Sequence, residues 1–166
     1  MPTSPNCLAR GRPGPSAARR RIRSDIGVHA KAQRREGDSV KIEELASIAV
    51  DCGFKLHKDL GRGLLEPVYE ILLAESLRER GLSVARQVPL PIKYKGVVVD
   101  NAFRIDLLVE DRLVIELKST ERDSALYPKQ LLTYLRLSNR SLGLLMNFGQ
   151  ETFKQGVQRV VNNHPS

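Results

Sequence analysis

The chain has 166 residues, of which 41% are hydrophobic and 28% charged, and its two cysteines, Cys7 and Cys52, lie far apart in sequence. This composition is typical of one folded domain with an appendage, and it excludes a collagen-like repeat, a wholly disordered chain and a disulfide scaffold. No apolar run approaches the roughly 18 residues that a membrane span needs, so we expect no membrane partner, and reduced thiols favour a cytoplasmic location.

The net charge of +8 is concentrated at the N-terminus. Residues 1–37 hold nine Lys and Arg against two acidic residues, whereas residues 38–166 hold 18 basic and 17 acidic residues. The first segment is rich in Pro and Gly and poor in large apolar side chains, so it cannot bury enough surface to offset its ordering entropy. We predict a disordered basic tail over residues 1–37, a solvated tail in preference to a polyanion-binding arm, and a folded domain over residues 38–166.

Two helices are predicted at the start of the folded part. Apolar residues recur at three- and four-residue steps over residues 40–60, and Gly61 ends that helix. A second helix is predicted over about residues 64–80, with Pro67 in its first turn and Gly81 as its left-handed cap. The predicted buried face of this second helix consists of Leu65, Val68, Leu72, Leu73 and Leu77.

Strand-like patterns follow Gly81. Turn signals at residues 95–96, 100–101 and 110–112 separate most of the predicted strands. These strands cover residues 84–88, 90–94, 97–99, 103–109 and 113–117. Their order and short connections predict an antiparallel meander.

Three further elements complete the predicted domain. They are a helix over about residues 124–137, a buried strand over 141–148 and a short helix over about 153–162. The complete order predicts an α/β, or α+β, fold in which helices flank a central mixed β-sheet.

Charged residues interrupt two of the predicted strands. Asp106 lies in an otherwise apolar stretch, and Glu116 and Lys118 interrupt the next strand. A buried carboxylate loses several kcal/mol of solvation unless it is paired, protonated or bound to a metal. Glu116 and Lys118 are two residues apart on a strand and therefore project to the same face.

The hairpin between these strands decides whether Asp106 joins the other two side chains. If Val109 pairs with Leu113 across a three-residue loop, Asp106 falls opposite Glu116 and the other face is wholly apolar. A two-residue loop would pair Asp106 with Ile115 and separate the charges. We predict the three-residue loop or an equivalent bulge.

Two carboxylates about 5 Å apart on paired strands repel each other, and a hard divalent cation such as Mg²⁺ or Mn²⁺ relieves that repulsion. We predict that Asp106 and Glu116 bind the metal. Lys118 would orient the attacking water or stabilise the charge that develops during in-line attack on a phosphate. The alternative is an exposed polar strand edge that carries a Glu-Lys pair.

The spacing of Asp106 from Glu116-Leu117-Lys118 resembles the signature of the PD-(D/E)XK nuclease superfamily, although Ile105 stands where the superfamily name has Pro. The motif of its GxxExxY branch is spelled by Gly63, Glu66 and Tyr69. The resemblance extends over about residues 42–162. It implies a restriction-endonuclease-like core.

The resemblance also implies roles for residues outside the two strands. Glu66 would be a further metal ligand or would position water, and Gln130 and Tyr134 would contact the phosphate backbone or brace the site, with Tyr69 in support. Ordinary alternatives stay open: a first-turn Glu favoured by the helix dipole, and a core Tyr with its hydroxyl at the rim. We expect His57, a lone helical His, to be structural.

Two classes of function follow. The first is a metal-dependent nuclease that hydrolyses nucleic-acid phosphodiester bonds, with DNA favoured by analogy. The second is a noncatalytic module that binds nucleic acid or protein on the same fold. The sequence leaves the oligomeric state open, a homodimer included.

Overall fold

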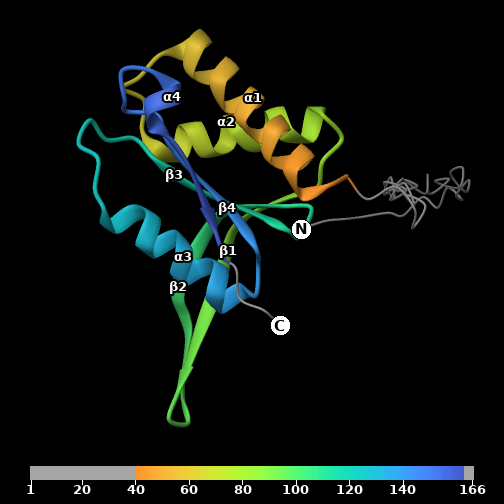
Figure 1. The fold of residues 1–166 in the computed structure, drawn as a ribbon, viewed down its shortest axis with the longest axis vertical. Coiled ribbons are helices and arrows are strands. Elements are labelled where there is room, and N and C mark those ends of the chain that lie inside the picture. Colours follow the sequence, from red (N-terminus) through yellow and green to blue (C-terminus); the bar gives the residue numbers. More distant parts are fainter. Residues whose placement is uncertain (1–39, 163–166) are drawn as a thin grey trace, which may run out of the picture. The chain divides into compact units, whose positions relative to one another are not determined.

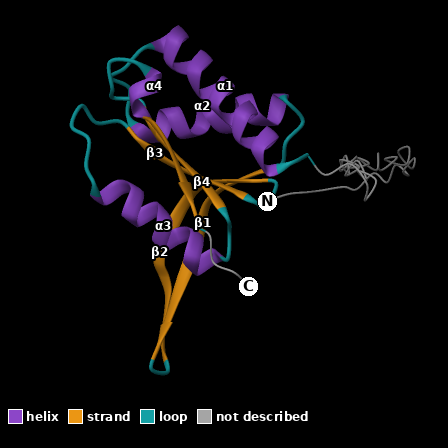
Figure 2. Cartoon of the chain, in the orientation of Figure 1, coloured by secondary structure: helices purple, strands orange, loops and turns teal. Residues whose placement is uncertain are grey.

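The computed structural model describes residues 40–162, so the predicted disordered tail over residues 1–37 lies outside the described residues. Two helices come first, three strands follow, and helices and strands alternate only from the third helix onward (Figure 2). The elements are α1 (Ile42–Leu60), α2 (Glu66–Glu79), β1 (Val84–Tyr94), β2 (Val97–Val109), β3 (Leu113–Lys118), α3 (Leu126–Ser138), β4 (Leu142–Asn147), α4 (Phe153–Gly156) and β5 (Val157–Val161).

The five strands form one mixed sheet in the order β1-β2-β3-β4-β5 (Figure 1). β3 and β4 are parallel, because α3 connects them, and the other neighbouring pairs are antiparallel. The predicted meander and the mixed sheet with flanking helices are confirmed. The architecture is that of a restriction-endonuclease-like α+β fold.

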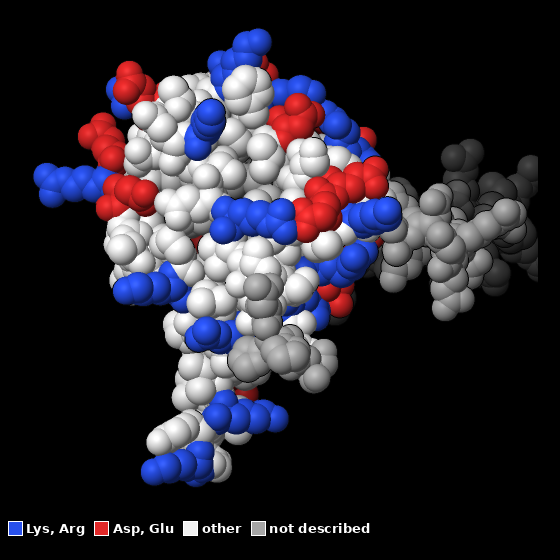
Figure 3. Space-filling view, viewed as in Figure 1, with Lys and Arg blue, Asp and Glu red and all other residues white. Residues whose placement is uncertain are grey.

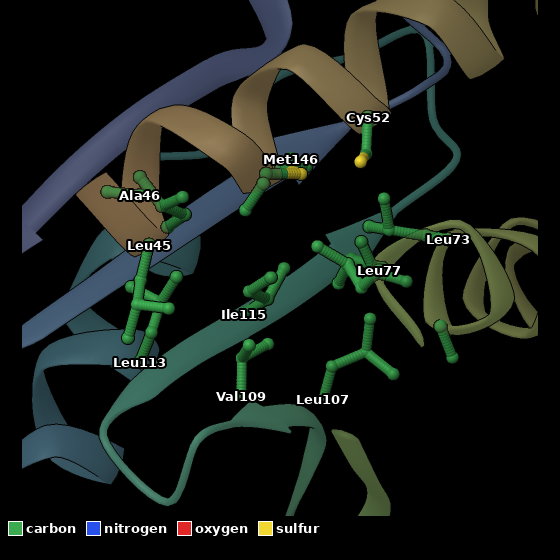
Figure 4. Packing of buried hydrophobic residues seen from close by; sticks show 14 of the residues in the cluster. Leu45, Ala46, Cys52, Leu73, Leu77, Leu107, Val109, Leu113, Ile115 and Met146 are labelled. Atoms are coloured by element: carbon green, nitrogen blue, oxygen red, sulfur yellow. The ribbon is translucent and has the colours of Figure 1, made fainter. Parts of the chain in front are cut away.

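Each face of the sheet is covered by its own hydrophobic cluster. The larger cluster joins α1, α2 and Phe153 of α4 to one face, and Figure 4 shows side chains of α1 and α2 meeting Leu113 and Ile115 of β3. The smaller cluster joins Leu131 of α3 to the opposite face. Because both faces are covered, the central strands β3 and β4 are buried almost throughout.

The second helix buries only part of the predicted face, since Leu73 and Leu77 are buried as predicted whereas Leu65 and Val68 are exposed. Leu65 is 75% exposed and precedes the helix, which begins at Glu66 with proline in its first turn. The buried stripe runs instead through Tyr69, Leu73 and Leu77, at steps of four residues. The predicted cap is confirmed, since Gly81 is left-handed with φ +77°.

The strands predicted between residues 84 and 109 merge into two long ones. Residues 100 and 101 lie inside β2, at an irregularity in the pairing near Leu90 and Ile92, so the turn signal there marks a bulge. The other predicted turn is confirmed: Lys95 and Gly96 both have positive φ, as a two-residue hairpin turn requires. β1 and β2 form a hairpin that projects from the body of the domain (Figure 1).

The helix predicted over residues 153–162 is wrong beyond its first turn. α4 ends at Gly156, and the valine-rich segment that follows forms β5, antiparallel to β4. Val157, Val160 and Val161 favour an extended chain, and the edge of β4 offers it hydrogen bonds. In the described part of the chain no helix is long and apolar enough to cross a bilayer.

Candidate active site

The β2–β3 hairpin sets the register of the candidate site. Val109 pairs with Leu113 across three loop residues, which confirms the predicted loop. Two of the loop residues, Glu110 and Asp111, have positive φ. The pairing continues to Leu107 and Ile115, and the next position in this register places Asp106 opposite Glu116.

Asp106 lies where the sheet opens. In the described sheet, the regular pairing of β2 with β3 ends at Leu107, the neighbour of Asp106. The pairing of β2 with β1 includes Ile105 and Leu107 but skips Asp106. Its carboxylate takes over part of the lost pairing, since Oδ2 accepts the backbone N–H of Leu117 at 2.8 Å. The side chain is therefore both a polar group of the site and a part of the sheet's hydrogen bonding.

Gln87 of β1 stands opposite Asp106 and adopts a left-handed φ of +53°. This conformation is uncommon for a residue with a side chain and costs about 1 kcal/mol or more. The Gln87 amide donates to Oε2 of Glu70 at 2.6 Å and lies 3.4 Å from Oδ1 of Asp106. The strained residue thus bridges two carboxylates that belong to different elements.

Glu70 is a site residue that the sequence reasoning missed. It is only 5% exposed, and its Oε1 accepts Nε of Arg86 at 2.8 Å. One signal was available: Glu70 follows Glu66 by four residues, so the two carboxylates share a face of α2. The acidic face of α2 therefore turns toward Gln87 and Asp106.

Glu116 and Lys118 form a buried ion pair, with Lys118 Nζ 2.7 Å from Glu116 Oε1. The ammonium also donates to the carbonyl of Leu117 at 2.8 Å and lies 5.6 Å from the ring centre of Tyr127. Glu116 is 3% exposed, and its second oxygen, Oε2, has no hydrogen-bond partner. A buried carboxylate oxygen without a donor is costly and suits a cation.

The charges of the site shift its proton equilibria. Burial, reinforced by the charge of Asp106, raises the pKa of Glu116 to about 7, although the bond from Lys118 opposes the shift. Burial also raises the pKa of Asp106, against the stabilising N–H of Leu117. Burial disfavours the Lys118 ammonium, but its bond to Glu116 and the surrounding carboxylates outweigh that effect and raise its pKa.

Glu66, in the first turn of α2, faces the same region. Burial raises the pKa of its carboxyl, and the charges of Lys118 and Asp106 act on it. Within residues 40–162, however, no group of three or more His, Cys, Asp or Glu side chains is arranged to hold a metal ion. The expected convergence of Glu66 with Asp106 and Glu116 around one ion is thus not preformed, and Lys118 occupies one oxygen of Glu116.

Tyr69 belongs to the core rather than to the surface of the site. It is fully buried and stacks on Phe148 at 4.3 Å between ring centres. Its hydroxyl donates to the carbonyl of Gly61 at 2.7 Å and accepts the N–H of Leu64 at 3.3 Å. Tyr69 therefore fixes the loop that leads into Glu66.

We expect Tyr69→Phe to lower the free energy of unfolding by about 1 to 2 kcal/mol, because a partly buried N–H and a partly buried carbonyl lose their shared partner. Urea unfolding followed by circular dichroism measures this loss. Val68→Ala, one position earlier and 38% exposed, is the control and should change the stability less. An unchanged midpoint for Tyr69→Phe would contradict the bracing role.

The other predicted supporting residues lie on α3. Gln130 donates its side-chain amide to the Tyr134 hydroxyl at 2.5 Å. Burial raises the pKa of Tyr134, and the charge of Glu116 raises it further. Tyr134 is 3% exposed, and its ring contacts Phe103, so it is also a core residue.

His57 lies away from these carboxylates. Its Nε2 is 3.2 Å from the carbonyl oxygen of Gln150, and its ring neighbours the Phe148 and Phe153 rings. These contacts agree with the structural role expected for a lone helical His.

A pocket of about 510 Å³ adjoins the α2 side of the site. Glu66 and Ser119 line it, and Ser119 Oγ donates to the carbonyl of Leu64 at 2.6 Å. The remaining lining residues are Arg62, Gly63, Leu64, Leu65, Glu121 and Gly149. Ser119 directly follows Lys118, the last residue of β3, so the pocket adjoins the end of that strand.

Comparison with known families gives one finding. Residues 43–160 match the family model described as the PD-(D/E)XK nuclease superfamily. The matched range runs from the second residue of α1 through α4 and leaves out only the last residue of β5. Comparison with curated proteins and with solved structures gives no match.

Proposed function

Because the chain belongs to the PD-(D/E)XK nuclease superfamily, we propose that it is an active metal-dependent nuclease that hydrolyses phosphodiester bonds of nucleic acid, with DNA as the favoured substrate. The superfamily supports a nuclease-like function. Beyond that, we propose that the protein turns over its substrate, that it uses a metal ion, and that named residues carry the reaction. None of this requires that the chain belong to the GxxExxY branch.

One observation carries the proposal: Glu116 Oε2 is buried and has no hydrogen-bond partner. A protein gains no stability from such an oxygen, so its presence beside a second buried acid favours a role in binding. Asp106 and Glu116 offer the hard oxygen atoms that Mg²⁺ or Mn²⁺ prefers. A bound cation would polarise the scissile phosphate and lower the pKa of a bound water.

The chain's own residues would divide the remaining work. Lys118 holds a proton tightly and lies against Glu116, so it would stabilise negative charge on the phosphate and orient the attacking water. Glu66 would hold a second-layer water or complete the ligand set. Gln130 and Tyr134, joined by their hydrogen bond, would keep α3 fixed beside the site.

A cleavage assay tests this function. Purified protein is incubated with labelled DNA and RNA, with and without Mg²⁺ or Mn²⁺. We expect metal-dependent cleavage that falls by about a thousandfold in Asp106→Asn and Lys118→Met, the size of effect seen when a group that stabilises a transition state is lost. Glu151→Gln, an exposed residue far along the chain, is the control and should retain full activity.

The same experiment, with binding measured alongside cleavage, distinguishes the nuclease from a noncatalytic binding module. Binding of nucleic acid without cleavage, unaffected by Asp106→Asn, would favour a noncatalytic module on this fold. Cleavage that is independent of added metal and resistant to chelation would contradict the proposed mechanism.

A further inference from the structure

The β1–β2 hairpin begins at the candidate site and extends away from it. Gln87 and Asp106 lie at its base, and the paired strands continue to Tyr94 and Val97 at the turn. α3 packs against the base, where the Phe103 and Tyr134 rings lie 5.3 Å apart. The hairpin between Gln87 and Ile105, here called the ribbon (residues 88–104), projects beyond this contact from the body of the domain (Figure 1).

The ribbon is apolar and exposed toward its tip. Tyr94 is 66% exposed, Val97 is 63% exposed, and the next two valines are half exposed. Exposed valines of this number on one short hairpin mark a contact surface rather than ordinary surface chemistry. We therefore expect the tip of the ribbon to contact a binding partner.

Charge indicates what kind of partner that is. Residues 88–104 contain three basic residues and one acidic residue, whereas the rest of residues 40–162 contains 15 of each sign. The ribbon therefore carries the whole net charge of the described domain. Figure 3 shows Lys and Arg side chains gathered at the projecting end of the hairpin.

The sequence of β1 disfavours a second copy of this chain as the partner. β1 is an edge strand of the sheet, and Pro89 and Pro91 remove two of its N–H donors. Prolines and lysines on an edge strand oppose pairing with another strand. Two ribbons that met side by side would also bring Lys93 and Lys95 of both copies together.

The dimensions fit a nucleic-acid duplex. The major groove of B-form DNA admits a two-stranded β-ribbon. Val97 precedes Asp106 by nine positions, so at about 3.3 Å per residue the tip lies up to about 30 Å from the site. That distance corresponds to about nine base pairs along the helix axis.

We propose that the ribbon is a duplex-binding arm that enters the major groove several base pairs from the scissile phosphate, with Lys93 and Lys95 on the backbone and Tyr94 in the groove. This inference rests on the proposed nuclease function and assigns its substrate a double-stranded segment on one side of the cleaved bond. The one-sided position of the arm sets the direction in which the substrate must extend.

Binding of a labelled 20-base-pair duplex, measured by fluorescence anisotropy in EDTA over a range of NaCl concentrations, tests the proposal. We expect Lys93→Ala/Lys95→Ala to weaken binding about tenfold at 100 mM salt and to reduce the slope of log Kd against log salt by about two, since each phosphate contact contributes about 0.9. Tyr94→Ala should weaken binding without changing the slope. Wild type should prefer the duplex over its single strand at least fivefold, and the double variant should lose that preference.

Lys41→Ala/Lys154→Ala removes two exposed lysines, one at the N-cap of α1 and one in α4, and is the matched control, expected to change Kd less than twofold. The full chain is used throughout, so any contribution of residues 1–37 is common to all variants. The proposal is overturned if the ribbon variant and the control behave alike, if the single strand is bound as well as the duplex, or if light scattering shows that the ribbon variant only dissociates a dimer.

The result is independent of turnover, because EDTA prevents metal-dependent cleavage. If the ribbon variant bound the duplex as well as the wild type and cleavage still depended on Asp106, only the proposed role of the ribbon would be overturned. Ribbon-dependent binding in a protein that does not cleave would instead overturn the proposed function.

Discussion

Glu116→Gln should make the protein more stable at alkaline pH while weakening the metal binding that we propose. The folded-state pKa of Glu116 is about 7, above its ordinary value of 4.5, so the folded protein holds this proton more tightly than the unfolded chain. The stability linked to this proton is present below pH 4.5 and is lost as the pH rises through about 7. Glutamine copies the protonated form and keeps that stability.

We expect Glu116→Gln to raise the free energy of unfolding by about 1 to 3 kcal/mol at pH 8.5 and to leave it nearly unchanged at pH 4.5. Urea titrations at both pH values measure the difference. Added Mg²⁺ should raise the melting temperature of the wild type at pH 8 but not that of the variant, because the variant lacks one of the two carboxylates that we propose as metal ligands.

Glu151→Gln provides the control, since it neutralises an exposed carboxylate and should show no such pH dependence. If Glu116→Gln destabilised the protein equally at both pH values, the carboxylate would be a purely structural partner of Lys118. Stabilisation together with lost metal binding is the pattern expected when a residue needed for function, here the buried Glu116 carboxylate, lowers the stability of the fold.

Gly149→Ala should cause one of the largest losses of stability available to a single methyl group in this domain. A Cβ at Gly149 would lie 2.4 Å from the backbone N and C atoms of Thr120, and 2.5 Å from its carbonyl oxygen. Thr120 cannot move aside easily, because the Asn147 side chain accepts its N–H at 3.0 Å and donates to its carbonyl at 2.9 Å. Backbone would have to shift on both sides.

We expect Gly149→Ala to lower the free energy of unfolding by about 3 kcal/mol or more and the melting temperature by about 10 °C. Differential scanning fluorimetry and urea unfolding measure these changes. Thr120 follows Lys118 by two residues, so the displaced segment should also reduce cleavage.

Gly96→Ala is the matched control, because its Cβ would meet nothing within 4 Å and only the positive φ would be strained. It should cost about 1 kcal/mol. Equal losses in the two variants would show that backbone conformation, and not the close approach to Thr120, dominates at Gly149.

The central part of the site was predictable because it breaks a pattern. Asp106, Glu116 and Lys118 are charged in stretches where almost every neighbour is apolar, and only one hairpin register gives a clean core face. That register is present, with Val109 paired to Leu113. Local sequence and burial therefore contain enough information to place the two strand acids together.

The rest of the site depends on tertiary contacts that leave no local pattern. Gln87 is a non-glycine residue in a left-handed conformation, and Glu70 looks like an ordinary helical acid until α2 packs against β1. The error at β5 has a similar cause. The spacing of Phe153, Val157 and Val160 suits a helix, and the open edge of β4 decides in favour of a strand.

Asp106 is both a proposed metal ligand and a hydrogen-bond acceptor of the sheet, and this limits the substitutions that the fold tolerates at position 106. Its oxygen holds the Leu117 amide at the point where the sheet opens, so deleting the side chain removes a structural acceptor together with the acid. Asparagine retains an acceptor at that place and alanine does not. A lineage that abandoned the chemistry but kept the scaffold would therefore tolerate asparagine at position 106 far more readily than alanine.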